Sequence, residues 1–156
     1  MRVAAAGVLL GMLAGTVVVS AGARAEDASE PIVVIANPVF GNIELTRSLV
    51  RDAYLGELRY LGNIAIAPIS LHERHPVAQA FLDEVMGMSE NQFKSWWIKR
   101  IFRHGDVPPM RVMDSAEMIA RVLATPGGMG YLSQSELPPG VPLTVVWRFT
   151  PQPATP

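Results

Sequence analysis

The 156-residue sequence contains no cysteine and no clear excess of charge of either sign. The absence of cysteine excludes disulfides, thiolate zinc sites, a cysteine nucleophile and a lipid-bearing cysteine. The 13 Lys and Arg residues are balanced by 14 Asp and Glu residues. Because nucleic-acid binders normally carry a basic excess on one face, we expect no nucleic-acid partner. The hydrophobic fraction of 49% excludes a disordered chain.

The motifs of common enzyme classes are also missing. No Walker loop, dinucleotide-binding glycine fingerprint or nucleophile elbow occurs, and no carboxylate pair has catalytic spacing. His72, Glu73 and His75 match no established zinc spacing and lack an evident fourth ligand. We therefore expect a protein that is not an enzyme, with no metal and no cofactor.

Residues 1–25 show the three parts of a secretory signal peptide. Arg2 supplies the positive start, a long uncharged apolar run follows, and Ala23-Arg24-Ala25 offers the small residues that signal peptidase needs. Cleavage after Ala25 leaves 11 basic and 14 acidic residues, a net charge of −3. The alternative is an uncleaved anchor, because the apolar run is long enough to span a bilayer. The well-formed cleavage site favours a periplasmic protein.

Residues 26–149 are expected to form one α/β domain, followed by a Pro-rich tail at 150–156, since no repeat or linker interrupts them. The continuous apolar run Ile32–Ala36 predicts a strand that is buried on both faces and ends at Asn37-Pro38. Three further segments have strand patterns: the two arms of a hairpin around Gly62-Asn63, at 58–61 and 64–69, and a closing strand at 143–149.

Four segments show the apolar spacing of helices, and each begins with a recognisable start signal. These signals are Thr46 for the first helix, Pro76 for the second, the capping-box pair Ser89 and Gln92 for the third, and Asp114 for the fourth.

The third helix carries two tryptophans beside basic residues. Trp96 and Trp97 are spaced with Phe93 and Ile101 to face the core, which we favour over base stacking. The basic residues fall outside that stripe and form either a solvated face or a docking surface for a protein partner. They are Lys94, Lys99, Arg100 and Arg103.

Three motifs then follow one another in a suggestive order. They are TRSLVRDAYLG at 46–56, the helix start His75-Pro76-Val77 with Phe81 and a tryptophan-containing segment at 92–97, and PGGMGY at 126–131. This order resembles the phosphate-type substrate-binding proteins of ABC transporters, over about residues 31–135. The resemblance implies one lobe of a type II periplasmic-binding-protein-like fold, with a central mostly parallel sheet flanked by about four helices. A full binder has two lobes that close on the ligand, and this chain is long enough for one.

The resemblance also points to the loop before the second helix. In that family an Arg and a Ser-Gly-Thr at this helix start hold the anion, whereas here these positions fall at Leu71 and at His75-Pro76-Val77. His72, Arg74 and His75 are therefore our main candidates for an anion site, because a helix start offers partial positive charge and free amides. The plain alternative is a solvated loop in which His75 caps the helix.

Two more residues complete the candidate ligand site. Ser115 begins the fourth helix and could add a hydroxyl donor, although plain capping of this helix is the stronger interpretation. Asn37 follows the first strand, at the kind of strand end where α/β sheets place ligands, and its alternative role is a simple turn.

These patterns together predict a periplasmic substrate-binding-protein-like domain that binds phosphate or another small oxyanion for ABC-type transport. The alternative is a ligand-free interaction module that docks to an envelope transporter or sensor protein. The sequence does not decide whether two copies of the chain form a homodimer and supply the two walls of a cleft.

Overall fold

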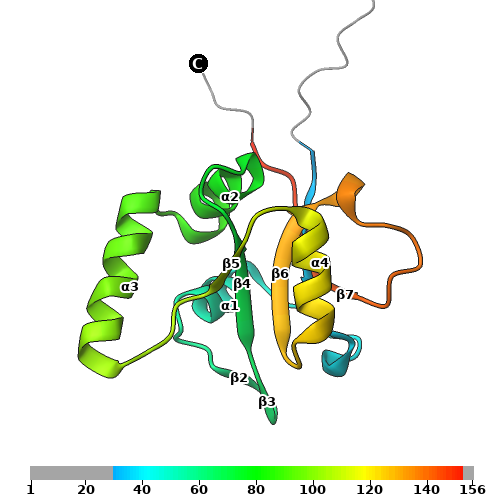
Figure 1. Cartoon of the computed structure of the whole chain (residues 1–156). Coiled ribbons are helices and arrows are strands. Elements are labelled where there is room, and N and C mark those ends of the chain that lie inside the picture. Colours follow the sequence, from blue (N-terminus) through cyan, green and yellow to red (C-terminus); the bar gives the residue numbers. More distant parts are fainter. Residues whose placement is uncertain (1–29, 153–156) are drawn as a thin grey trace, which may run out of the picture.

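The computed structural model describes residues 30–152 of the chain (Figure 1). The expected signal peptide at 1–25, its cleavage after Ala25 and the last part of the expected tail lie outside these residues. Within residues 30–152, no helix has the length and apolar content that crossing a bilayer requires.

A five-stranded sheet with the order β5-β4-β6-β1-β7 forms the centre of the molecule. The strands are β1 (Ile32–Ala36), β4 (Ala67–Leu71), β5 (Met110–Val112), β6 (Gly128–Ser133) and β7 (Thr144–Phe149). β4 pairs in parallel with β5 and β6, whereas β1 pairs antiparallel with β6 and β7. Four strands therefore run in one direction and only β1 runs against them, which confirms a mostly parallel sheet.

β1 lies inside the sheet and, like β6, is buried along its whole length. All five of its residues are buried, as the continuous run of apolar side chains predicts. Hydrogen bonds to β6 and β7 satisfy its backbone on both sides. The closing strand predicted at 143–149 is confirmed as β7, which makes the sheet edge beside β1.

In the described part of the chain, residues 30–152, four helices surround the sheet, and their start signals act as the sequence predicts. The helices are α1 (Arg47–Tyr54), α2 (Pro76–Phe81), α3 (Glu90–His104) and α4 (Ser115–Ala124). Thr46, Ser89 and Asp114 each accept a hydrogen bond from a backbone N–H of the first turn. α2 continues into a π-helical turn, η2 (Leu82–Met86), which ends at Gly87. Single 3-10 turns follow β1, as η1 (Pro38–Phe40), and β6, as η3 (Gln134–Glu136).

α4 lies against the front of the sheet in Figure 1, whereas α1 lies behind it. The close approach of α4 depends on Gly130, because a Cβ atom added there would come within 2.3 Å of the sulfur of Met118. A glycine in this strand thus lets α4 sit directly on the backbone of β6.

The hairpin predicted around Gly62-Asn63 is present but much shorter than expected. It consists of β2 (Tyr60–Leu61) and β3 (Ile64–Ala65), so the expectation of one arm from 64 to 69 is wrong. The chain changes partners after Ile66, because the N–H of Ile66 still donates to Arg59 O but the N–H of Ala67 donates to Gly127 O. The rest of the expected arm becomes β4 of the central sheet.

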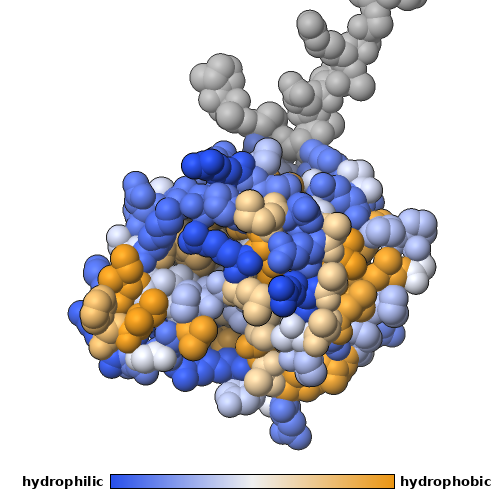
Figure 2. All heavy atoms as spheres, viewed as in Figure 1, coloured by the Kyte–Doolittle hydropathy of each residue, from blue (hydrophilic) through white to orange (hydrophobic). Residues whose placement is uncertain are grey.

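The prediction of a core-facing stripe along α3 is only partly correct. Trp97 is buried and Phe93 and Trp96 are half-buried, but Ile101 is 42% exposed. α3 lies beside the sheet in Figure 1 rather than across it. Its second half therefore leaves the core, and Figure 2 shows apolar side chains on the surface over this helix.

Candidate functional site

The carboxyl ends of β4 and β5 meet at one edge of the sheet because the two strands are parallel. Leu71 pairs with Val112, and the N–H of His72 donates to Val112 O at 2.8 Å. The loop 72–75 follows β4 at this edge and leads into α2. β5 leads within three residues to the start of α4. Two chain segments with polar side chains therefore leave the sheet side by side.

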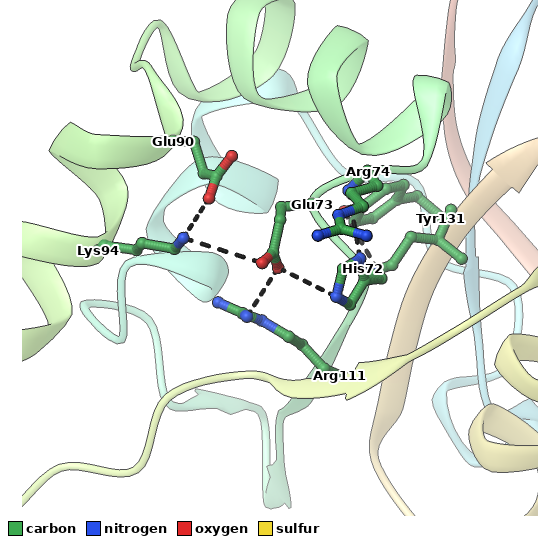
Figure 3. Close-up of polar contacts among 8 residues, drawn as sticks. His72, Glu73, Arg74, Glu90, Lys94, Arg111 and Tyr131 are labelled. Atoms are coloured by element: carbon green, nitrogen blue, oxygen red, sulfur yellow. Dashed lines mark hydrogen bonds and ion pairs between the residues drawn. The ribbon is translucent and has the colours of Figure 1, made fainter.

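Glu73 stands at the centre of a cluster of ion pairs at this edge (Figure 3). Its carboxylate lies 2.7 Å from Nη1 of Arg111, 3.7 Å from Nε2 of His72 and 3.9 Å from Nζ of Lys94. Lys94 also pairs with Glu90, one turn earlier on α3. β5, α3 and the loop after β4 thus all direct basic side chains toward one carboxylate.

The surroundings of Glu73 lower the pKa of its carboxyl group. The largest cause is the hydrogen bond from its own backbone N–H, and the charges of Arg111, His72 and Lys94 act in the same direction. Partial burial opposes them. Glu73 is therefore ionised at neutral pH, and its own carboxylate pairs with the basic side chains when no ligand is bound.

The three candidates from the loop before α2 have different roles. Nδ1 of His75 accepts the N–H of Val77 at 3.3 Å, so His75 caps α2, as the plain alternative predicts. Nδ1 of His72 accepts the N–H of Arg74 at 3.3 Å, which leaves Nε2 facing Glu73. The guanidinium of Arg74 is exposed and makes no ion pair within residues 30–152.

Ser115 lies at the same sheet edge, but its hydroxyl is already used. The hydroxyl donates to Oε2 of Glu136 at 2.6 Å, and the residue is buried. Asp114 caps this helix by accepting the N–H of Glu117, and the Glu117 carboxylate accepts the N–H of Met113. Ser115 therefore has a structural role in this protein, and its hydroxyl already has a hydrogen-bond partner.

Asn37 is not part of the candidate site. Because β1 runs against the other strands, its carboxyl end lies beside the start of β6 and not beside the end of β4. The side-chain amide donates to Val122 O at 3.0 Å and Leu123 O at 3.1 Å. Asn37 thus satisfies two carbonyls at the end of α4, which have no partner within that helix.

The basic face expected on α3 is also smaller than predicted. Arg100 turns inward, where its guanidinium donates to Asp106 at 2.9 Å and to Gly56 O at 3.0 Å. Lys99 and Arg103 are exposed, as expected for a solvated or docking surface.

Sequence reasoning missed Lys94 and Arg111 as parts of the site. Arg111 belongs to β5, a strand that the sequence analysis did not predict. Its register places it beside Ser70, one residue from the Leu71 position where the resemblance expects an arginine. The alternation of apolar, charged and apolar residues at Met110-Arg111-Val112 is a short strand pattern that could have revealed it.

Aromatic side chains form the base of the site. Phe81 stacks on Tyr131 with ring centres 3.8 Å apart, and Tyr54 meets both rings edge-on. The hydroxyl of Tyr54 donates to Ile69 O, and that of Tyr131 accepts the N–H of Leu71. Burial raises the pKa of both tyrosines, which keeps the base of the site uncharged. These rings join α1, α2 and β6 into a rigid support.

The cavity between this base and the ion pairs is small. It measures about 30 Å³ and is lined in part by Tyr131, Glu73, Lys94 and Arg111. Within residues 30–152, no three His, Asp or Glu side chains are placed to hold a metal ion. Because Glu73 already pairs with these basic side chains, an anion that binds them competes with its carboxylate.

Comparisons with known proteins identify the fold. No family model and no curated protein matches the sequence. An ABC-type phosphate transport receptor from Vibrio cholerae is 13% identical, with a TM-score of 0.58 over 75% of this chain and 45% of the receptor. A protein from Clostridium perfringens, described as a phosphate ABC transporter substrate-binding protein and solved with bound phosphate, is 17% identical. Its TM-score is 0.60, over 75% and 44% of the two chains.

PstS from Borrelia burgdorferi is a third similar structure, with 15% identity and a TM-score of 0.53 over 67% of this chain and 41% of PstS. The chain thus spans less than half the length of these proteins. These likenesses confirm the fold that the order of motifs predicts. The described domain has the fold of part of the phosphate-type substrate-binding proteins.

Proposed function

We propose that the chain is a non-enzymatic, periplasmic, one-lobed binding protein that holds phosphate or another small oxyanion at the carboxyl edge of β4 and β5. The observation that carries this proposal is the convergence of Arg111, Lys94 and His72 on the carboxylate of Glu73. These basic groups come from three separate elements, and all of them face one anionic position. The fold and the bound phosphate in one similar structure add support.

The incoming oxyanion takes the position of the Glu73 carboxylate. A guanidinium binds two oxygens of a carboxylate or a phosphate with parallel N–H donors, so Arg111 is able to bind either group. The side chain of Glu73 is 24% exposed, which gives it room to turn toward solvent. Arg74, which has an exposed guanidinium, adds positive charge beside the opened position.

Transport is the process that this binding would serve. The similar proteins are named for phosphate transport by ABC transporters, and we propose the same role here. Since the chain spans less than half of their length, one lobe leaves the oxyanion open on one side. An envelope transporter or a second copy of the chain would supply the other wall.

Calorimetric titration of the chain from Glu26 onward tests the proposal, because this chain contains every residue of the described fold. We expect saturable binding of phosphate or sulfate that weakens at least about tenfold in Arg111→Ala and Lys94→Ala. Arg121→Ala removes an equally exposed arginine from α4 and should bind as the unchanged protein does. Absence of heat with every small oxyanion, or equal loss in all three variants, would contradict the proposal.

Docking to an envelope transporter or sensor protein is a second candidate function, and one observation favours it. Phe102, in the last turn of α3, and Val107, three residues after that helix, are 87% and 83% exposed, and Lys99 and Arg103 on α3 are exposed as well. Large exposed apolar side chains next to charge are typical of interaction surfaces.

Cross-linking in the cell envelope tests this second function. The expected result is one identified membrane protein whose yield falls in Phe102→Ser and in the double variant Lys99→Glu, Arg103→Glu. Arg121→Glu, a charge reversal on α4, should leave the yield unchanged. A yield that is the same in all variants would rule out this surface.

A further inference from the structure

A groove of about 280 Å³ lies next to the oxyanion site, with α3 and β5 among its walls. It shares Ser70, Phe93, Lys94 and Arg111 with the small cavity beneath Glu73. The two spaces are therefore neighbours, and the same two cations border both. The remaining lining is apolar and comes from Trp97, Ile98, Ile101, Pro108 and Pro109.

The apolar wall of this groove is open to solvent in the described structure. Ile98 is 54% exposed and Ile101 is 42% exposed, although both belong to an otherwise well-formed helix. The buried indole N–H of Trp97 has no hydrogen-bond partner within residues 30–152. The groove thus combines an uncovered apolar wall with a cationic end.

The sizes of the two spaces indicate a ligand with two different parts. A cavity of about 150 Å³ accommodates a benzene molecule, so a groove of about 280 Å³ has room for a ring of that size. The cavity of about 30 Å³ beneath Glu73 does not. The position of the Glu73 carboxylate suits a charged oxyanion, and the groove suits an attached apolar group.

We infer that the ligand is an organic oxyanion, a phosphate monoester or a carboxylate, with one apolar group about the size of a benzene ring. This inference rests on the proposed oxyanion site and names the class of its ligand. The oxyanion binds Arg111 and Lys94, and the apolar group packs between Ile98, Ile101 and the prolines. Burial of that group adds affinity that inorganic phosphate lacks.

Calorimetry with matched ligands tests the inference in the chain from Glu26 onward. The probes are inorganic phosphate, phenyl phosphate, benzoate and the cation benzylamine, all at one pH and salt concentration. We expect phenyl phosphate to bind at least about tenfold more tightly than phosphate, since a phenyl group buries a large apolar surface. Benzylamine, which has the ring but the opposite charge, should not bind.

Variants of the groove wall locate the effect. The double variant Ile98→Ser, Ile101→Ser changes two exposed side chains and should lose most of the gain that the phenyl group provides. Val39→Ser changes an exposed valine of η1 that does not line the groove, and should keep the whole gain. Binding of benzoate alone would identify the ligand as a carboxylate and support the same class.

The outcomes separate this inference from the proposed function. Equal affinities for phosphate and phenyl phosphate, both lost in Arg111→Ala, would overturn the ligand class and leave the oxyanion site in place. A phenyl gain that persists in the double variant would also overturn it. No binding of any anion would remove the proposed function and the inference together.

Discussion

α4 and α3 are both amphipathic helices beside the same sheet, yet they are held in different ways. α4 buries Met118 and Val122 against β6, and Gly130 removes the side chain that would keep them apart. α3 buries only Trp97. Its position depends on polar contacts, in which Trp96 donates to Leu55 O and Arg100 donates to Gly56 O.

This difference explains why the candidate site lies beside α3. A helix packed into the core has one allowed position, because close-packed side chains tolerate little displacement. A helix held by a few polar contacts can shift slightly as those contacts adjust. α3 carries Lys94 and the apolar wall of the groove, so the part of the site that must accommodate a ligand is on the less tightly packed helix.

The largest effect is expected where α4 meets the sheet. Gly130→Val forces a branched side chain against the sulfur of Met118 and should lower the free energy of unfolding by about 3 kcal/mol. Chemical denaturation measures the loss. Met118→Ala by itself empties a buried position, so the two changes are compared in a double-mutant cycle. Gly130→Val should cost less in the Met118→Ala background than beside Met118. An equal cost in both backgrounds would mean that the contact with Met118 is not the cause.

A smaller effect is expected where α3 is held by charge. Asp106→Ala removes the partner of both Arg100 and Arg59 and should cost about 1.5 kcal/mol. Hydrogen exchange should become faster in α3 while α4 stays protected. Arg59→Ala breaks only the more exposed of the two pairs and is the matched control. Equal acceleration in both helices would show that α3 and α4 are held in the same way.

A still smaller effect is expected at the ion-pair cluster itself. Glu73→Gln keeps the shape of the side chain but removes the charge that competes with a ligand. Oxyanion affinity should rise about fivefold, as expected for the loss of an exposed ion pair. Glu90→Gln removes the other partner of Lys94 and serves as the comparison. Weaker binding in Glu73→Gln would mean that this carboxylate supports the ligand instead of competing with it.

The smallest effect is a pH dependence of stability at Glu73. The folded protein lowers the pKa of this carboxyl group below 4.5, its ordinary value. Its contribution to stability is therefore complete above that value and is lost as the pH falls through the lowered pKa. The difference in unfolding free energy between the unchanged protein and Glu73→Gln should shrink on acidification. A difference that stays constant from neutral pH to pH 3 would contradict the shift.

Local signals in the sequence predict the elements that depend on local chemistry. Thr46, Ser89 and Asp114 cap their helices because a short side-chain oxygen reaches an N–H only three residues away. The strand Ile32–Ala36 is predicted equally well, since five consecutive apolar residues indicate a strand that is covered on both faces. The order of motifs predicts the fold because each motif marks one local segment, and their order gives the sequence in which these segments follow one another.

The site depends on longer-range pairing, which the sequence does not display. Asn37 is misplaced because the direction of β1 relative to β4 is a property of the whole sheet. Lys94 and Arg111 are missed because they meet Glu73 only when α3 and β5 are in place. Ile98 and Ile101 have the spacing of an amphipathic helix, and no local pattern shows that their face stays uncovered.

Ile32, the first residue of β1, pairs with Phe149, the last residue of β7, so the chain enters and leaves the sheet at neighbouring positions. The first and last strands are neighbours, so a short peptide could connect them without crossing the fold. New ends could then be opened at the exposed turn Gly62-Asn63, far along the sequence from the old ones. In engineering terms the domain is a candidate for circular permutation, and it could be inserted as a single unit into a loop of another protein.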